Sequence, residues 1–459
     1  MSDSIQNPHP VNRRTFLAAI PTAIAAAPLV AATTDGQKLA IDGGTPVRAS
    51  RHMSGAGYPG ARVYDDQEKK EVSEAIDTKT LFRFYGPGKP HKVEYFEKEL
   101  AAYLGAKHVL GVTSGTAALH IALTALGVGP GDEVILPAHA WHSCYTTIVL
   151  TGALPVFAEV DDSFSIDPVD LEKKITPQTK VVMVLHLDGI PADMDKIMAI
   201  ARSHNLKVLE DVAQSFGVQY KGKRAGTIGD IGIFSFQIHK LISSGEGGAL
   251  VTNDPLLFER SIRFHDLGLL RDFHEPVLGK PHVPIPVPEF PGTNYRMNEM
   301  VGGVMRAQLR KVENIIAGLR QNGRYVKQRI KDVPGIKLRL SHDPEGTIDW
   351  TIDLMLPNQQ LRDRFIAAME AENVSMGRPN GANYIPRLPY VVNKVAPHPE
   401  WPSFNSPRGK SIRYGVECCP RTQEIFARSA TLTIGQKFTE TDVKDIVAAI
   451  TKVHRALVV

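Results

Sequence analysis

The chain alternates short apolar runs with stretches of helical periodicity, and this alternation limits the folds open to it. The runs include HVLGV, DEVILPAHA, ALPVFAEV, TKVVMVLHL, LKVLED, IGIFSFQ and GALVTN, several of them separated by segments with helical spacing. Such a pattern favours an α/β domain with a mostly parallel mixed sheet flanked by helices. Ligands of these sheets bind beyond the carboxyl ends of the strands, so we expect functional residues directly after the runs.

The pattern changes near residue 310 and divides the chain into two predicted domains. Residues 33–310 carry the alternation and form the larger α/β domain, while residues 311–459 predict a smaller C-terminal α+β domain. In the second part, a proline-rich segment is expected to be loop. Thr439 and Asp442 have the spacing of a capping box ahead of the last helix. A length of 459 residues is compatible with this division.

Residues 1–32 have the layout of a twin-arginine signal segment. Arg13 and Arg14 precede an apolar stretch over residues 16–30, and small residues allow cleavage after Ala32. The stretch is too short, and too interrupted by prolines, to span a membrane, and no later segment could do so. We therefore expect a periplasmic or secreted protein, the alternative being a cytoplasmic one with an uncleaved tail.

Charge and cysteine content exclude some classes of function. The 53 basic and 49 acidic residues leave a formal charge of +4, scattered along the chain, which does not favour nucleic-acid binding. The three cysteines form no disulfide framework. His139 and His142 invite a metal-site interpretation, but no third ligand stands at a recognisable spacing, so we predict no metal site.

Several predicted strand ends carry residues suited to an anionic, planar ligand. In VTSGTAAL, Gly115 and Thr116 open a helix, where free backbone N–H groups favour a phosphate, although small residues also begin helices with nothing bound. Trp141 follows the next strand and could stack on a planar ring, or simply belong to the core.

Two later strands supply an acid and a lysine. LKVLED ends at Asp211, which could pair with a charged heterocycle, and Gln214 lies within reach of the same ligand if a helix starts there. FSFQIHK alternates like a half-buried strand and brings Lys240 towards the strand end. Either charged residue could instead be a solvated strand terminus.

These stretches, in this order, resemble the DegT/StrS family of pyridoxal-phosphate-dependent sugar aminotransferases, which have the transferase fold type I. The resemblance covers nearly everything after residue 32 and includes VEYFEKELAAYLGAKHVLGVTSGTAALHIAL, GVGPGDEVILPA, GALPVFAEVD, HLDGIPADMDKI, EDVAQSFG, GDIGIFSFQIHK, GEGG and GTNYRMNE. It implies that Lys240 forms an imine with the cofactor aldehyde and that Asp211 keeps the ring nitrogen protonated.

The resemblance also implies the remaining cofactor contacts. Trp141 matches the stacking residue and Gln214 the residue near the cofactor hydroxyl. The phosphate-binding positions are matched by Gly115, Thr116 and Ser235, and by Asn294, which a partner subunit is thought to contribute. We therefore expect a homodimer with shared sites, in which glutamate or glutamine donates an amino group that passes to a keto sugar or keto cyclitol.

Some positions depart from the family pattern or favour one acceptor. Gln237, where many sugar-nucleotide aminotransferases have histidine, resembles the subgroup acting on inososes and related cyclic ketones, including aminohydroxybenzoate synthases. Ala140 and Cys144 replace threonines, and Asp188 replaces an aromatic residue; we expect these changes to reshape the acceptor pocket without touching cofactor chemistry.

Three other functions compete with this interpretation. A non-catalytic sugar-binding or regulatory protein would not need Lys240. The dehydratases of the family either replace this lysine or work with an iron–sulfur partner, and the chain has no cysteine cluster. A nicotinamide dehydrogenase is disfavoured because no G-x-G-x-x-G follows a strand.

Overall fold

The computed structural model describes residues 38–53, 63–84, 91–269, 289–379 and 384–458. These residues belong to one compact unit, Lys38–Val459. The predicted signal segment lies outside the described residues, as do residues 33–37 of the predicted larger domain. Within the described part of the chain, no helix is long and apolar enough to cross a membrane.

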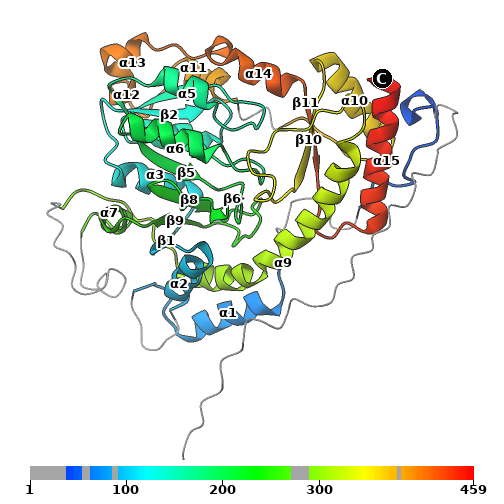
Figure 1. Cartoon of the computed structure of the whole chain (residues 1–459). Helices are drawn as coiled ribbons and strands as arrows, with labels where there is room; N and C mark the ends of the chain where they lie inside the picture. Colours follow the sequence, from blue (N-terminus) through cyan, green and yellow to red (C-terminus); the bar gives the residue numbers. More distant parts are fainter. Residues whose placement is uncertain (1–37, 54–62, 85–90, 270–288, 380–383, 459) are drawn as a thin grey trace, which may run out of the picture. The chain divides into compact units, whose positions relative to one another are not determined.

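A seven-stranded sheet forms the centre of the larger part (Figure 1). Its order is β1-β9-β8-β5-β4-β2-β3, and β9 alone runs antiparallel to its neighbours. The strands span His108–Val112 (β1), Glu133–Pro137 (β2), Leu154–Ala158 (β3), Thr179–Leu185 (β4), Lys207–Asp211 (β5), Ile231–Ser235 (β8) and Gly248–Thr252 (β9). The mostly parallel mixed sheet predicted from the alternation is therefore confirmed.

Helices cover both faces of this sheet because successive strand residues point to opposite sides. On β4, Val181 and Met183 pack into the core under α3, α4 and α7, while Val182 and Val184 pack towards α5 and α6. These helices are α3 (Gly115–Ala125), α4 (His142–Leu150), α5 (Pro168–Lys174), α6 (Met194–Ser203) and α7 (Pro255–His265). A short hairpin, β6 (Gln219–Tyr220) and β7 (Lys223–Arg224), follows β5.

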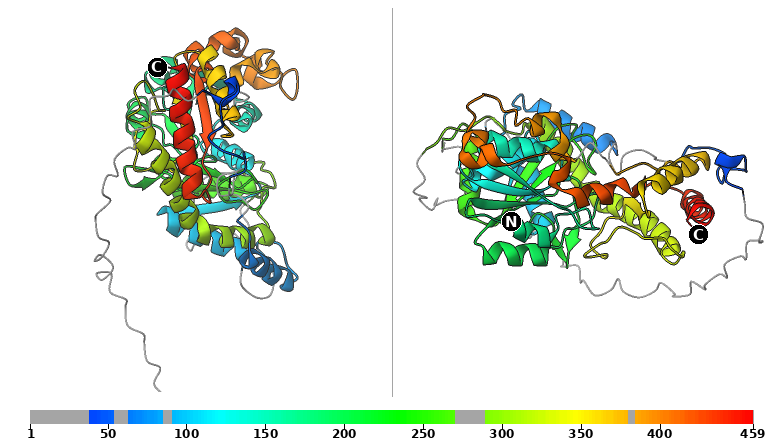
Figure 2. Two further views of the ribbon diagram at one scale, coloured as in Figure 1. Left: turned by 90° about the vertical axis from the view of Figure 1, so that its right-hand side faces the viewer. Right: turned by 90° about the horizontal axis from the view of Figure 1, so that it is seen from above.

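The C-terminal part is built on an antiparallel ribbon of β10 (Thr351–Met355) and β11 (Ser429–Thr433). The helices α10 (Gln359–Ala371) and α15 (Glu440–Leu457) pack with this ribbon and with α9 (Glu299–Ile330) around a separate apolar core (Figures 1 and 2). Thr439 and Asp442 form the predicted capping box of α15.

The long helix α9 connects the two parts. It packs against α1 (Asp66–Asp77) and α2 (Lys92–Leu104) as well as against α15. The predicted domain boundary between residues 310 and 311 falls inside α9, so the helix belongs to both parts and the division stays a prediction. Part of the proline-rich segment expected to be loop forms short helices that begin with proline: α11 (Pro389–Val392), α12 (Pro402–Asn405) and α13 (Pro407–Ser411); α14 (Pro420–Ala427) follows.

Candidate active site

A cavity of about 700 Å³ opens at the carboxyl ends of β4, β5 and β8. In register across these strands, Leu185 pairs with Asp211 and Asp211 with Ile233, and all three residues line the cavity. The predicted residues Gly115, Thr116, Trp141, Asp211, Gln214, Ser235 and Lys240 line it too. Seven of the eight predicted site residues are thus brought together, and Asn294 is the exception.

The start of α3 forms one wall of the cavity. Ser114 caps the helix by accepting a hydrogen bond from the N–H of Ala117 at 3.0 Å. A Cβ atom added to Gly115 would lie 2.7 Å from the Cβ atom of Ser235, so only glycine allows the end of β8 to approach the helix this closely. Helix N-terminal N–H groups and the Ser235 hydroxyl therefore border the same space, as a phosphate site requires.

Lys240 lies in a turn, not at a strand end as predicted. Strand β8 ends at Ser235, and the chain then folds back on itself through hydrogen bonds from Phe236 N–H to Gly247 O (2.9 Å) and from Ile238 N–H to Gly245 O (3.0 Å). Burial lowers the pKa of Lys240, against the opposing effect of the Asp211 carboxylate. A lower pKa increases the fraction of neutral amine, the form that attacks an aldehyde.

Asp211 is buried at the end of β5. Its Oδ1 accepts a hydrogen bond from the Ala213 N–H at 2.9 Å, and its Oδ2 accepts one from the Cys144 thiol at 3.3 Å. Burial raises the pKa of Asp211, while these hydrogen bonds stabilise its charged form. Ala140 and Cys144 are fully buried and do not line the cavity, so the expectation that they reshape the acceptor pocket is wrong.

Trp141 and Gln214 lie in the cavity wall on different elements. Trp141 is the residue before α4, and its side chain is 48% exposed, unlike a tryptophan of the core. Gln214 lies in a turn after β5, where Ser215 N–H bonds to Val212 O at 2.9 Å, so the helix considered at this position does not form. The turn nevertheless leaves Gln214 at the cavity.

His186 is a further cavity residue that the sequence reasoning did not single out, although it stands in the quoted motif HLDGIPADMDKI. Its Nδ1 accepts a hydrogen bond from the Ala192 N–H at 3.2 Å, so its Nε2 carries the proton that bonds Glu210 at 3.0 Å. Burial tends to raise the pKa of Glu210, but hydrogen bonds from His186 and from the backbone hold that pKa below its usual value.

Asn294 is exposed and does not line the cavity of its own chain. Its backbone forms an isolated bridge with Asp266, and its Oδ1 accepts a hydrogen bond from the Arg296 N–H at 3.4 Å. Arg296 also forms an ion pair with Asp266. The residue thus sits on an ordered surface segment.

The donor set at the cavity fits pyridoxal phosphate. The start of α3 and Ser235 suit the phosphate, Asp211 is a buried carboxylate whose Oδ2 receives only a thiol hydrogen bond among the described residues, and Lys240 is a partly desolvated amine. Among the same residues, no group of three or more His, Cys, Asp or Glu side chains is placed to hold a metal ion. His139 is buried against the Phe426 ring, 3.9 Å between ring centroids, and His142 bonds the Tyr390 hydroxyl.

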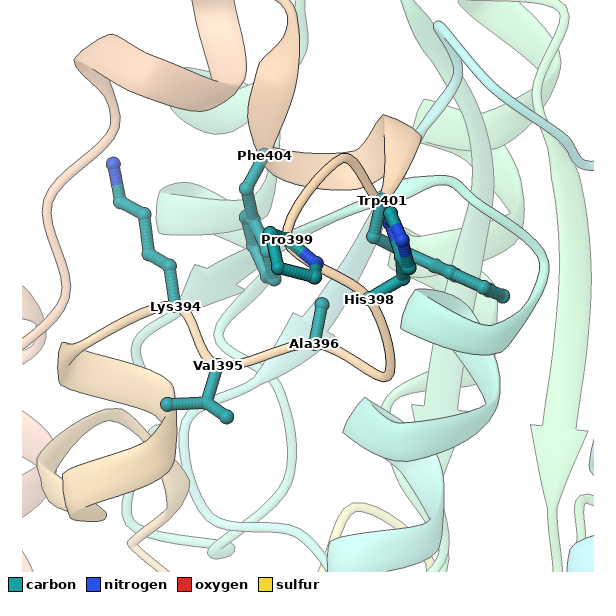
Figure 3. A pocket seen from close by; sticks show the side chains of 7 residues that line it. All are labelled: Lys394, Val395, Ala396, His398, Pro399, Trp401 and Phe404. Carbon is teal, nitrogen blue, oxygen red and sulfur yellow. The ribbon is translucent and has the colours of Figure 1, made fainter.

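A second cavity, of about 230 Å³, lies among residues of the proline-rich segment. Figure 3 shows its wall, which is formed by Lys394, Val395, Ala396, His398, Pro399, Trp401 and Phe404. The Lys394 ammonium donates a hydrogen bond to the Gly409 carbonyl at 2.8 Å, and the Trp401 indole donates one to the Val149 carbonyl at 2.6 Å. Both polar groups therefore already donate hydrogen bonds within the protein.

Comparison with known proteins agrees with this site. The model of the DegT/DnrJ/EryC1/StrS aminotransferase family matches residues 63–395. The spore coat polysaccharide biosynthesis protein SpsC of Bacillus subtilis is 33% identical over 84% of this chain and 93% of its own. The L-glutamine:2-deoxy-scyllo-inosose aminotransferase of Streptomyces kanamyceticus is 31% identical over 92% of this chain and 98% of its own.

A solved structure, that of 3-amino-5-hydroxybenzoic acid synthase, superposes with a TM-score of 0.70 at 26% identity, over 87% of this chain and 99% of the other. The predicted family, enzyme class and cofactor are thereby confirmed. The chain belongs to the DegT/DnrJ/EryC1/StrS aminotransferase family and is a pyridoxal-phosphate-dependent aminotransferase.

Proposed function

We propose that the enzyme transfers an amino group from L-glutamine or L-glutamate to a keto cyclitol of the inosose type, or to a keto sugar. The observation that carries the transfer itself is the placement of Lys240 and Asp211 in one cavity. The choice of acceptor is supported by the extent of the similarities. Relatives named as inosose aminotransferases match 91–92% of this chain, whereas the match to GDP-perosamine synthase of Escherichia coli covers 58%.

Bound pyridoxal phosphate would supply an electron sink, and it would carry the amino group from the donor to the acceptor. Lys240 would hold it through the Nζ atom and, once released, move a proton to or from the reacting carbon with the same atom. The Asp211 carboxylate would keep the ring nitrogen protonated, and Trp141 would cover the ring. The phosphate would bind to Ser235, Thr116 and the N–H groups at Gly115.

The lysine in this cavity also disfavours the competing functions. A sugar-binding or regulatory protein needs no desolvated lysine, and a dehydratase that replaces the lysine is inconsistent with Lys240. We also propose a homodimer in which Asn294 completes the partner's phosphate site, since the residue is exposed and does not line the cavity of its own chain. We likewise propose that the protein is exported through the twin-arginine segment and that its two domains divide at residue 310.

The proposal is tested by the visible absorption of the protein after addition of pyridoxal phosphate. We expect a visible band of bound cofactor that is lost when L-glutamine or L-glutamate is added, and that is absent in Lys240→Ala. Lys437→Ala removes an exposed lysine and serves as the matched control, which we expect to behave like the wild type. If the wild type binds no cofactor, or if Lys240→Ala responds to the donor as the wild type does, the proposed function is wrong.

A further inference from the structure

The ribbon of β10 and β11 presents one polar face to the cavity. Thr351 pairs with Thr433, and Asp353 pairs with Thr431, so these four residues lie on the same side of the ribbon. Thr351, Thr431 and Thr433 line the cavity. The opposite side carries Ile352, Leu354 and Leu432, which pack in the apolar core of the C-terminal part. The ribbon therefore has an apolar inner face and a hydroxyl-bearing face at the site.

Asp188 adds a carboxylate to the same cavity from the end of β4. Asp188 and Gly189 have φ values of 54° and 79° and connect Leu187 to Ile190, which form an isolated antiparallel bridge. Both values lie in the left-handed region, where aspartate and asparagine are tolerated better than most side chains. The two-residue turn therefore suits aspartate better than the aromatic residue common in the family, and the side chain stays 24% exposed.

Two carboxylates of this region, Asp188 and Asp353, share one arginine. The Arg339 guanidinium lies 3.4 Å from Asp188 and 3.2 Å from Asp353, and it also donates hydrogen bonds to the carbonyls of Ser163 and Leu187. Arg339 is thus paired with two carboxylates, and because its side chain is only 2% exposed, it is not available to a ligand. Asp353 is further occupied by the hydroxyls of Thr351 and Thr431, at 3.1 and 2.6 Å.

Two groups remain available to a ligand. Thr433 is exposed, and its hydroxyl makes no hydrogen bond to any described residue. The Asp188 carboxylate accepts a hydrogen bond only at Oδ2, from Arg339, within the described part of the chain, while its backbone carbonyl accepts one from the Thr351 hydroxyl at 3.5 Å. Besides Lys240, the cavity lining includes Arg378, whose side chain is 62% exposed and pairs with Asp363 at 2.9 Å. The surface formed by Asp188, Thr351, Thr431 and Thr433 is called here the polar wall. It offers the Asp188 carboxylate and the Thr433 hydroxyl to a ligand, while the Thr351 and Thr431 hydroxyls are bonded to Asp353, and none of its four residues is a cation.

We propose that the polar wall binds the hydroxyl groups of the acceptor, and that it selects an uncharged, hydroxyl-rich ring over a ring carrying a phosphate at that end. This inference rests on the proposed function and narrows its acceptor class. A carboxylate accepts hydrogen bonds from hydroxyl groups, and bonds to a charged partner are stronger than neutral ones. A phosphate placed against Asp188 would instead meet like charge, and the nearest cation, Arg339, is already shared between two carboxylates.

The test measures ligand binding rather than turnover. Isothermal titration calorimetry is carried out on protein supplied with pyridoxal phosphate, with scyllo-inositol as the uncharged probe and GDP-mannose as the phosphate-bearing probe. We expect scyllo-inositol to bind and GDP-mannose to bind more weakly. In Asp188→Asn, which keeps the shape and suits the left-handed backbone, the Kd for scyllo-inositol should rise about tenfold. In Thr433→Val the Kd should rise about fivefold.

Thr441→Val, an exposed threonine on α15, is the matched control and should leave the Kd unchanged. The inference is overturned if scyllo-inositol does not bind the wild type, if it binds both variants as tightly as the wild type, or if GDP-mannose binds more tightly than scyllo-inositol. Failure of the proposed function is recognised separately in the same samples, because it removes the visible cofactor band or its response to the donor.

Discussion

At the scale of single residues, the hydrogen bond from Cys144 helps to stabilise the charged form of Asp211. The buried thiol has a pKa raised well above its usual value, mainly by burial, so it stays protonated and donates to the carboxylate at 3.3 Å. That bond works against the effect of burial, which raises the pKa of Asp211. The side chain at position 144 therefore influences cofactor binding, although it never borders the cavity.

Cys144→Ala should weaken the binding of pyridoxal phosphate about fivefold, because it removes one hydrogen bond from the charged form of Asp211. The pKa of Asp211 should rise further. Below its pKa the carboxylate is neutral and no longer pairs with a protonated ring nitrogen, so cofactor release on acidification should begin at a higher pH than in the wild type. The measurement is the visible band as a function of cofactor concentration and pH.

Cys144→Ser keeps a donor at the position and should restore most of the affinity. An Ala variant that binds the cofactor as tightly as the wild type, with the same pH of release, would contradict a role for the thiol.

The residues of the site could be predicted from sequence to different degrees. Lys240 and Asp211 stand in distinctive motifs, and the cavity contains both. The contact of Cys144 with Asp211 joins residues 67 positions apart, and the orientation of Asp188 depends on a backbone angle. Neither feature leaves a pattern in the sequence, so the sequence alone does not place Cys144 beside Asp211.

At the scale of elements, α3 and the end of β8 approach each other closely at the site. Gly115→Ala should destabilise this junction, because the new Cβ atom would lie 2.7 Å from the Cβ atom of Ser235. Overpacking of this kind typically costs about 1–3 kcal/mol. The displaced helix start should also weaken cofactor binding. Thermal unfolding, measured with and without pyridoxal phosphate, checks both effects.

Gly129→Ala is the matched control, since a Cβ atom there meets nothing within 4 Å and the residue does not have a positive φ. We expect it to leave the melting temperature and cofactor affinity close to those of the wild type. If Gly115→Ala is as stable as Gly129→Ala and binds the cofactor equally well, the close approach is not required.

Sequence periodicity predicts most of the strands but not where the strand before Lys240 ends. The apolar runs became strands because their side chains are buried on both faces of a parallel sheet. The run FSFQI has the same alternation but leaves the sheet at Ser235, because Phe236 and Ile238 bond to Gly247 and Gly245 of the following loop. Local periodicity cannot distinguish pairing with a strand from pairing with a nearby loop.

At the scale of the whole molecule, the outstanding proposal is that two chains share their sites. Asn294 is exposed and does not border the cavity of its own chain, and in a two-fold dimer each chain could present it to the other. Sequence alone could suggest this arrangement only through family resemblance, since a contact between chains leaves no periodicity within one chain.

Hybrid dimers test the arrangement directly. Lys240→Ala and Asn294→Ala proteins should each have little activity, the first through loss of the lysine and the second through a damaged phosphate site. Dissociated and reassociated together, half of the dimers should be hybrids, and each hybrid should contain one site with an intact Lys240 and an Asn294 from the other chain. Activity should therefore recover to about one quarter of the wild-type value. If Asn294 serves its own chain, every Lys240 site in the mixture lacks it, and no recovery should follow. Sedimentation analysis of the mixture confirms that dimers have re-formed, so that an absence of recovery counts against the shared site.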